Sequence, residues 1–209
     1  MNTFHPENKN LNLFYEKEWM QLSLQHNHAP FILNYLQSML NVLKNAVIVM
    51  RRVFVLRFDL HLPDSYFDNG SLVSKLTSSL KAQLEANYQR RLKDNPKAHY
   101  SPLAYIWTRE EGLNNKAHYH FVILLNLDAY ATLGTIPRLE TIDSQHFNGD
   151  NMACRIIKAW ASALHINAVY AYPLVHFPQN CGYKIGVFHE ILDINSFEKM
   201  FYRLSYLAK

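Results

Sequence analysis

The stretch that decides the fold is residues 117–126, which read AHYHFVILLN. Its pattern repeats every two residues, which is typical of a β-strand. In such a strand His118 and His120 project from one face, about 7 Å apart at their Cα atoms. Val122 and Leu124 continue that face, and the residues between them face the other way: Tyr119, Phe121, Ile123 and Leu125. The sequence therefore predicts a strand that presents two imidazoles side by side.

A second strand is predicted over residues 103–111, just before the first, which spans residues 116–126. The segment between them contains residues typical of a hairpin connection: Gly112, Asn114 and Asn115. If the loop is centred on Asn114, Glu110 lies opposite His118, and opposed residues of an antiparallel pair point to the same face. Two imidazoles and a carboxylate on rigid strands can hold one divalent ion and leave positions for phosphate and water.

The residues alone leave another interpretation of His118 and His120 open. The chain has 11 histidines, so one His-x-His string is close to chance. A second such string, His26-Asn27-His28, lies in polar surroundings, and we interpret it as two ordinary residues. If the string at 118–120 is also a chance occurrence, His118 and His120 are two half-exposed histidines on the surface of a sheet.

The remaining pattern predicts an α+β fold. Residues 53–62 alternate as a half-buried strand, with Arg57, Asp59 and His61 on its polar face. Helices are predicted over residues 72–95, 149–164 and 195–209, and further strands over 168–175 and 183–188. We expect an antiparallel sheet with helices packed mainly on one face, spanning residues 51–209. Residues 1–50 are expected to form a helical extension without strands.

Bulk properties narrow the class of protein. The 209 residues carry a net charge of +4 and a pI near 9.0, which suits a nucleic-acid partner, although the charges are spread along the chain. The two cysteines, Cys154 and Cys181, form no zinc or disulfide pattern. No apolar run is long enough to span a bilayer and the start lacks signal-peptide order, so we expect a cytoplasmic protein without a membrane partner.

The last predicted helix carries two tyrosines. Tyr202 and Tyr206 are four residues apart and Lys209 is three further on, so all three are expected to share one helical stripe beside the apolar one. A tyrosine hydroxyl has an ordinary pKa near 10, so it needs a metal-polarised phosphate or a nearby cation to act as a nucleophile. Lys209 is a candidate for that cation. The alternative is that these tyrosines only pack the helix against the sheet.

Three segments together resemble a known family: WTREEG (107–112), AHYHFVILLN (117–126) and FYRLSYLAK (201–209). They are similar to the inovirus-type replication proteins, also called the YagK/YfjJ C-terminal domain, which occur in phages and phage-derived elements of bacteria. The resemblance includes RFDLHLP (57–63), runs from about residue 53 to the end, and is not expected to cover the first 50 residues.

The resemblance implies a branch of the HUH Rep endonucleases, with an RRM-like sandwich fold. It implies a metal held by His118, His120 and an upstream acid, here Glu110, and a nucleophile at Tyr206. Tyr202 is similar to a second tyrosine that some rolling-circle initiators use. The implied reaction is nicking and strand transfer of single-stranded DNA or an origin hairpin through a 5′-phosphotyrosine, with host replication proteins as partners.

The chemistry implied by this resemblance favours Mg²⁺ or Mn²⁺, because either ion polarises a scissile phosphate. Four further residues are candidate DNA contacts: Arg57, His61, Lys199 and Arg203. Two other classes of function remain open. One is a DNA-binding or regulatory protein that keeps the fold without catalysis, and the other is an α+β interaction module.

Overall fold

The computed structural model describes residues 3–64, 66, 68, 70–111, 117–136, 150–189 and 191–209. Within them the chain forms an α+β structure around one large sheet. The expected turn at residues 112–115 and the expected helix start at residue 149 lie outside these ranges. No helix in the described ranges is both long and apolar enough to cross a membrane.

The large sheet is antiparallel, as predicted. Its order is β11-β10-β6-β8-β7, and β9 also pairs with β6. The strands are β6 (Arg52–His61), β7 (Ala104–Glu111), β8 (Ala117–Asn126), β9 (Val175–His176), β10 (Gly182–Phe188) and β11 (Ile191–Leu192). The prediction that residues 53–62 are half-buried is wrong, because Val55 and Phe58, which point to opposite faces, are both fully buried.

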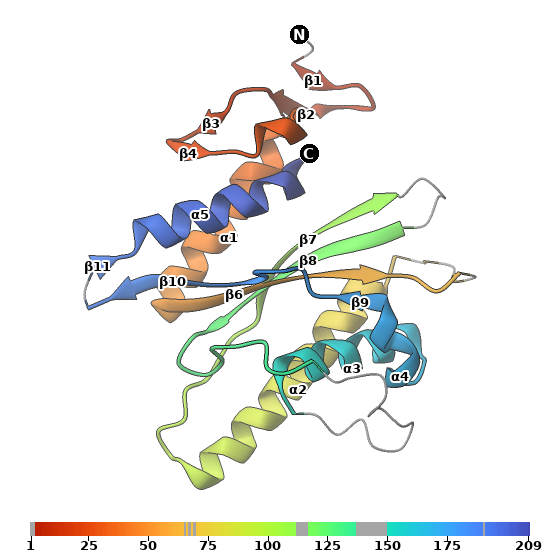
Figure 1. Ribbon diagram of the computed structural model, residues 1–209, viewed down its shortest axis with the longest axis vertical. Coiled ribbons are helices and arrows are strands. Elements are labelled where there is room, and N and C mark those ends of the chain that lie inside the picture. The colour runs from red at the N-terminus through yellow and green to blue at the C-terminus, as the bar shows by residue number, and fades with distance from the viewer. Residues whose placement is uncertain are drawn as a thin grey trace.

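Helices cover both faces of the sheet, which corrects the expectation that they lie mainly on one (Figure 1). One layer contains α2 (Leu72–Asp94) and α3 (Met152–Leu164), and the other contains α1 (Leu33–Met50) and α5 (Ile194–Leu204). Each layer encloses its own apolar core, with Phe58 and Trp160 in the first and Val55 and Phe201 in the second. The central strands carry apolar side chains on both of their faces. Each face of the sheet therefore needs a layer of helices to shield it from water.

The N-terminal segment is not the helical extension expected for residues 1–50. Before α1 it consists mostly of short strands: β1 (Phe4–His5), β2 (Asn8–Phe14), β3 (Glu18–Trp19), β4 (Leu22–Ser23) and β5 (Phe31–Ile32), with one 3-10 turn, η1 (His26–His28). Within residues 3–50 the α-helix is confined to residues 33–50, which share a core with β6 and β8. Short polar strands paired across long separations leave little local signal in a sequence.

Two local predictions also need correction. Residues 168–174 form the helical turns α4 (Ala168–Ala171) and η3 (Tyr172–Leu174), so only the end of the expected strand is extended, in β9. Asn167 explains this, because its side chain accepts a hydrogen bond from the backbone of Val169 and starts α4. The C-terminal helix α5 is capped by Asp193 rather than Asn195, and it continues as the 3-10 turn η4 (Ser205–Ala208).

Candidate metal centre

The register of the sheet brings Glu110, His118 and His120 to one place on the face covered by α1 and α5. Glu110 of β7 pairs with His118 of β8, so the predicted register is confirmed. Val122 follows on the same face and lies in the core beneath α1, whereas Tyr119 lies in the opposite core. The predicted division of β8 into two faces is therefore also confirmed.

The three side chains converge on one point. Glu110 Oε2 lies 3.4 Å from His118 Nε2 and 3.3 Å from His120 Nε2. The three ligand atoms all lie within 4.8 Å of one another. Two donors bound to one ion at about 2.1 Å each are separated by roughly 3 to 3.5 Å, so these distances suit a shared metal. The donor set, with two imidazoles and one carboxylate, suits a first-row divalent ion and tolerates Mn²⁺ or Mg²⁺.

Asp59 on β6 holds His120 in the form that a metal needs. Asp59 Oδ1 lies 2.6 Å from His120 Nδ1. Burial by itself raises the pKa of Asp59, but the hydrogen bond from His120 and the charge of Arg57 outweigh it and lower the pKa to about 2. Because an ionised carboxylate only accepts, Nδ1 carries a proton, and Nε2 is the nitrogen that faces Glu110 and is left to bind a metal. A carboxylate behind a histidine is a common support for a metal ligand.

Glu110 uses its two oxygens differently. Oε2 faces the histidines, whereas Oε1 lies 3.1 Å from Lys209 Nζ as an ion pair, without the geometry of a hydrogen bond. Burial raises the pKa of Glu110, but the neighbouring ammonium of Lys209 and the contact with His120 outweigh it, so the pKa is lowered. Glu110 is therefore a carboxylate at neutral pH, and Lys209 leaves the oxygen that faces the histidines accessible.

Tyr206 lies against the same cluster. Its ring centroid is 5.2 Å from that of His120, and the guanidinium of Arg57 lies over the ring at 4.5 Å. Arg57 Nη2 also donates a hydrogen bond of 2.6 Å to the Tyr206 hydroxyl. Burial raises the pKa of Tyr206, and Arg57 opposes that rise because it favours the phenolate. With 8% of its surface exposed, Tyr206 is a buried phenol beside a fixed cation.

The expected stripe of Tyr202, Tyr206 and Lys209 is not formed as predicted. Tyr206 and Lys209 reach the cluster, whereas the side chain of Tyr202 is 43% exposed to solvent. The cause is the change from α5 to the tighter turn η4 between these residues. A 3-10 turn has three residues per turn, so positions four apart no longer share a face.

The four residues predicted to contact DNA occupy different environments. Arg57 is largely buried and is engaged by Tyr206 and Asp59, so its place is inside the cluster. His61 is exposed at the rim, where its ring stacks on that of His118 at 5.9 Å. Lys199 and Arg203 are exposed on α5, at the outer surface.

Sequence reasoning missed two neighbours of the cluster, His176 and His28, and placed a third, Asp59, on the polar face of its strand without its partner. Asp59 pairs in register with His120 across β6 and β8, a contact that the order of the strands would have revealed. His176 of β9 lies 3.4 Å from the second oxygen of Asp59. His28, which we interpreted as an ordinary polar residue, contacts the ring of Tyr206 at 5.6 Å. No local pattern predicts the positions of His28 or His176, because tertiary packing alone brings them here.

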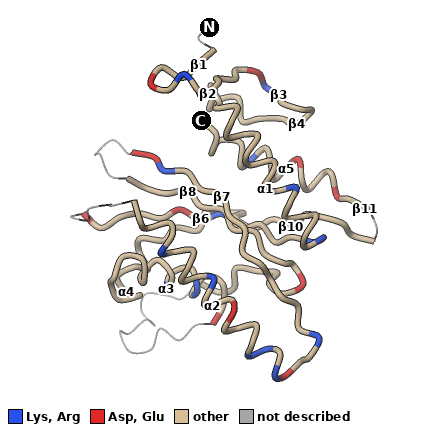
Figure 2. Tube along the Cα trace, turned by 180° about the vertical axis from the view of Figure 1, so that it is seen from behind, with Lys and Arg blue, Asp and Glu red and all other residues tan. Residues whose placement is uncertain are grey.

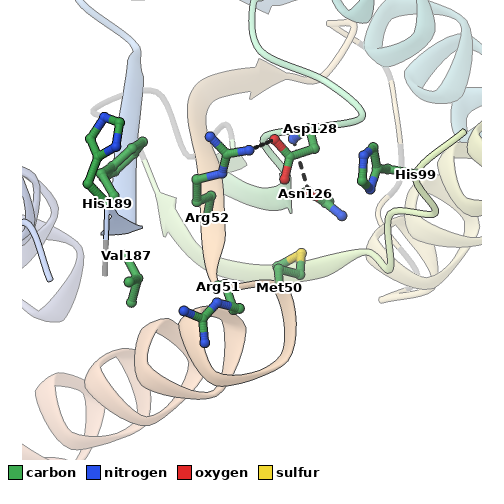
Figure 3. Close-up of a pocket in the computed structure, with 9 residues that line it drawn as sticks. Met50, Arg51, Arg52, His99, Asn126, Asp128, Val187 and His189 are labelled. Atoms are coloured by element: carbon green, nitrogen blue, oxygen red, sulfur yellow. Dashed lines mark hydrogen bonds and ion pairs between the residues drawn. The ribbon is translucent and has the colours of Figure 1, made fainter. Parts of the chain in front are cut away.

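A basic pocket lies at the opposite end of the same strands from the cluster (Figure 3). Arg52 lines it and forms an ion pair with Asp128, and His99 and His189 lie at its sides. Elsewhere, basic residues are spread over the sheet and both helical layers (Figure 2). Charge alone therefore does not locate a functional site in this molecule, whereas the convergence of donor atoms does.

The fold and the cluster define an α+β protein with a two-histidine, one-carboxylate site on an antiparallel sheet. The chain belongs to the YagK/YfjJ C-terminal domain family, whose match spans residues 15–209. It therefore also covers much of the N-terminal segment, which corrects the expectation that the resemblance begins near residue 53.

Two relatives come from Escherichia coli strain K12. The chain is 32% identical over 202 residues to the uncharacterized protein YagK, covering 88% of each chain. It is 32% identical over 168 residues to the uncharacterized protein YfjJ, covering 74% of this chain and 76% of that one. No solved structure gives a significant match.

Proposed function

We propose that this protein is a metal-dependent endonuclease of the HUH type that nicks and rejoins single-stranded DNA through a covalent bond to Tyr206. The observation that carries this proposal is the contact of the Tyr206 ring with His120, one member of the Glu110, His118 and His120 cluster. A tyrosine hydroxyl can attack a phosphodiester when a metal polarises the phosphate and a cation such as an arginine stabilises the phenolate.

The metal would be held by His118 Nε2, His120 Nε2 and Glu110 Oε2, the three atoms that face one another. Mg²⁺ or Mn²⁺ bound there supplies charge that polarises the scissile phosphate and leaves coordination positions for its oxygens. Asp59 serves this site by keeping the proton of His120 on Nδ1.

The covalent step exchanges one phosphodiester bond for another. The Tyr206 oxygen forms a bond to phosphorus, the bond from phosphorus to the 3′-oxygen breaks, and the proton lost by the phenol is balanced by the one gained by the 3′-hydroxyl. Arg57, 2.6 Å from the hydroxyl, stabilises the phenolate as it develops. Lys209, beside Glu110, lies where it can offset charge on the phosphate.

The resemblance to inovirus-type replication proteins suggests the substrate, the partners and the cellular location for the proposed reaction. The substrate would be an origin in single-stranded or hairpin DNA, and host replication proteins would be partners. The protein would act in the bacterial cytoplasm, encoded by a phage or prophage. Tyr206 and Tyr202 are not equivalent in this proposal, since Tyr206 is buried against the cluster and Tyr202 is exposed.

The test is covalent capture of labelled DNA. The protein is incubated with Mn²⁺ and a pool of random single-stranded oligonucleotides, and adducts are resolved on a denaturing gel. A 3′-label should become attached to the protein, because the tyrosine retains the 5′-phosphate of the downstream strand. A 5′-label should instead appear on a shortened strand that ends in a 3′-hydroxyl.

Tyr206→Phe should abolish the adduct. Tyr202→Phe is the matched control, because it removes a tyrosine hydroxyl four residues away and should retain the adduct. Chelation of the metal and His120→Ala should each abolish it too. An adduct that persists in Tyr206→Phe, in Tyr202→Phe and in the double variant would exclude the covalent mechanism.

One observation favours a second function, that of a DNA-binding protein without nuclease activity. Tyr206 is buried and burial raises its pKa, so a purely structural phenol is the alternative. In that case the wild type would bind single-stranded DNA without forming an adduct at any metal concentration.

A further inference from the structure

A groove lies between α1 and the edge strand β7, next to the metal cluster. Its volume is about 660 Å³, within the range of roughly 300 to 1,000 Å³ typical of ligand sites. Ile106 and Thr108 of β7 line one side, Tyr35 and Met39 of α1 line the other, and Lys209 also lines the groove. Because Lys209 is also 3.1 Å from Glu110, the groove lies beside the cluster.

The lining of the groove has the chemistry of a single-strand site. Arg109 and Lys209 are the only charged residues among its described lining residues, and both are basic. Both are also ion-paired to carboxylates, Arg109 to Glu111 and Asp68, and Lys209 to Glu110, so the groove is basic without a large excess of charge. Such a surface suits the mixture of phosphate and base contacts of single-stranded DNA.

Aromatic side chains stand exposed along the groove. Tyr35 is 43% exposed and Trp107 is 44% exposed, although both are large apolar groups that normally gain from burial. Trp107 packs against the ring of Tyr119, with centroids 6.0 Å apart, so its ring is supported from behind and lies across the edge strand from α1. Supported, exposed rings beside a basic residue are the platforms on which unpaired bases stack.

We propose that this groove and the adjoining edge of β7 bind the segment of single-stranded DNA next to the scissile phosphate. The strand would cross β7, with bases against Tyr35 on the α1 side and Trp107 on the other side, and phosphates near Arg109 and Lys209. The inference rests on the proposed function, because it names where that substrate lies. A base needs an exposed π-face rather than a particular hydrogen-bond pattern, so the groove tolerates many sequences, and recognition of a particular origin would have to lie elsewhere.

The test measures binding separately from cleavage. Fluorescently labelled oligo-dT of about 15 nucleotides is titrated with Tyr206→Phe protein, which lacks the proposed nucleophile, and anisotropy gives the Kd. Adding Trp107→Ala or Tyr35→Ala should each weaken binding about tenfold, since stacking of one base contributes about 1–3 kcal/mol. Tyr170→Ala is the matched control, because Tyr170 is 70% exposed on α4, outside the groove, and its loss should leave the Kd unchanged.

Trp107 also provides a direct readout. The chain has three tryptophans, and Trp160 is buried, so binding of oligo-dT should quench the emission that Trp107→Phe removes. Unchanged Kd values in both groove variants, or no binding of oligo-dT by the parent protein, would overturn the groove. A strand of a protein partner as the true occupant would give that result.

The two proposals fail in different ways. Binding that depends on Tyr35 and Trp107, without an adduct in the wild type, would retain the groove and reject the nuclease. An adduct in the wild type, with binding indifferent to both residues, would retain the nuclease and reject the groove.

Discussion

Tyrosines on the two faces of the sheet have different hydrogen-bond partners, although burial raises the pKa of both. On one face the Tyr119 hydroxyl donates a hydrogen bond to Asp68, and burial together with that carboxylate raises its pKa. On the other face the Tyr206 hydroxyl accepts a hydrogen bond from Arg57. An anion beside a phenol opposes the phenolate, whereas a cation favours it. The partner of the hydroxyl, rather than closeness to the histidines in sequence, therefore marks the candidate nucleophile.

The largest expected effect concerns the metal. His120→Ala should weaken Mn²⁺ binding, measured by titration calorimetry, by more than about 100-fold, because loss of a ligand exceeds the roughly 10–100-fold cost of losing an outer partner. Tyr119→Phe, one residue away on the opposite face, should leave the affinity unchanged. Equal affinity in wild type and His120→Ala would place the metal elsewhere.

Asp59→Asn should weaken Mn²⁺ binding about 10–100-fold without removing a ligand. The neutral amide no longer holds the proton on Nδ1 of His120, so Nε2 loses part of its lone-pair population. The same calorimetric titration checks this, with Asp128→Asn as the control at the opposite end of the sheet. A shift as large in the control would point to a general loss of structure instead.

Trp160→Phe should lower the free energy of unfolding by about 1–3 kcal/mol, measured in urea. Trp160 fills the core under α3, and its indole nitrogen donates a 3.0 Å hydrogen bond to the carbonyl of His61. Metal affinity of the folded protein should change less than about twofold, because the core that Trp160 fills lies on the opposite face of the sheet from the cluster. A large loss of affinity would show that the two faces are coupled through the end of β6.

Tyr119→Phe should have the smallest effect, about 0.5–1.5 kcal/mol at neutral pH. Burial raises the pKa of Asp68, but the hydrogen bond from Tyr119 and other partners outweigh it and lower the pKa below 3.8. A group with a lowered folded-state pKa contributes stability that is present above its unfolded pKa and is lost as pH falls through the folded value. The difference between wild type and Tyr119→Phe should therefore shrink below about pH 4, as thermal unfolding against pH would check.

Much of the cluster was predictable because it depends on period and register. Strand alternation placed His118 and His120 on one face, and hairpin pairing placed Glu110 beside them. Lys209 follows Tyr206 by three residues, but its ion pair with Glu110 depends on tertiary packing, as does the arrival of Tyr206. The relations within the hairpin are local, so the sequence carries them.

The parts that were wrong depend on tertiary structure. The second layer of helices follows from apolar residues on both faces of β6, which a period-two interpretation of residues 53–62 assigned to one face only. The turn η4 that separates Tyr202 from the cluster has no sequence signature of its own. His28 arrives from a segment whose short strands pair across long separations, which no periodicity reveals.

The hydrogen bond between the backbone of Gln25 and Ser205 joins residues 180 positions apart, and the Gln25 side chain also donates to the carbonyls of Tyr202 and Arg203. Contacts between such distant residues form late, because a long loop must close first. During synthesis the site can therefore be assembled only after residues 205 and 206 have left the ribosome. A DNA-cutting activity built in this way would stay silent in the nascent chain.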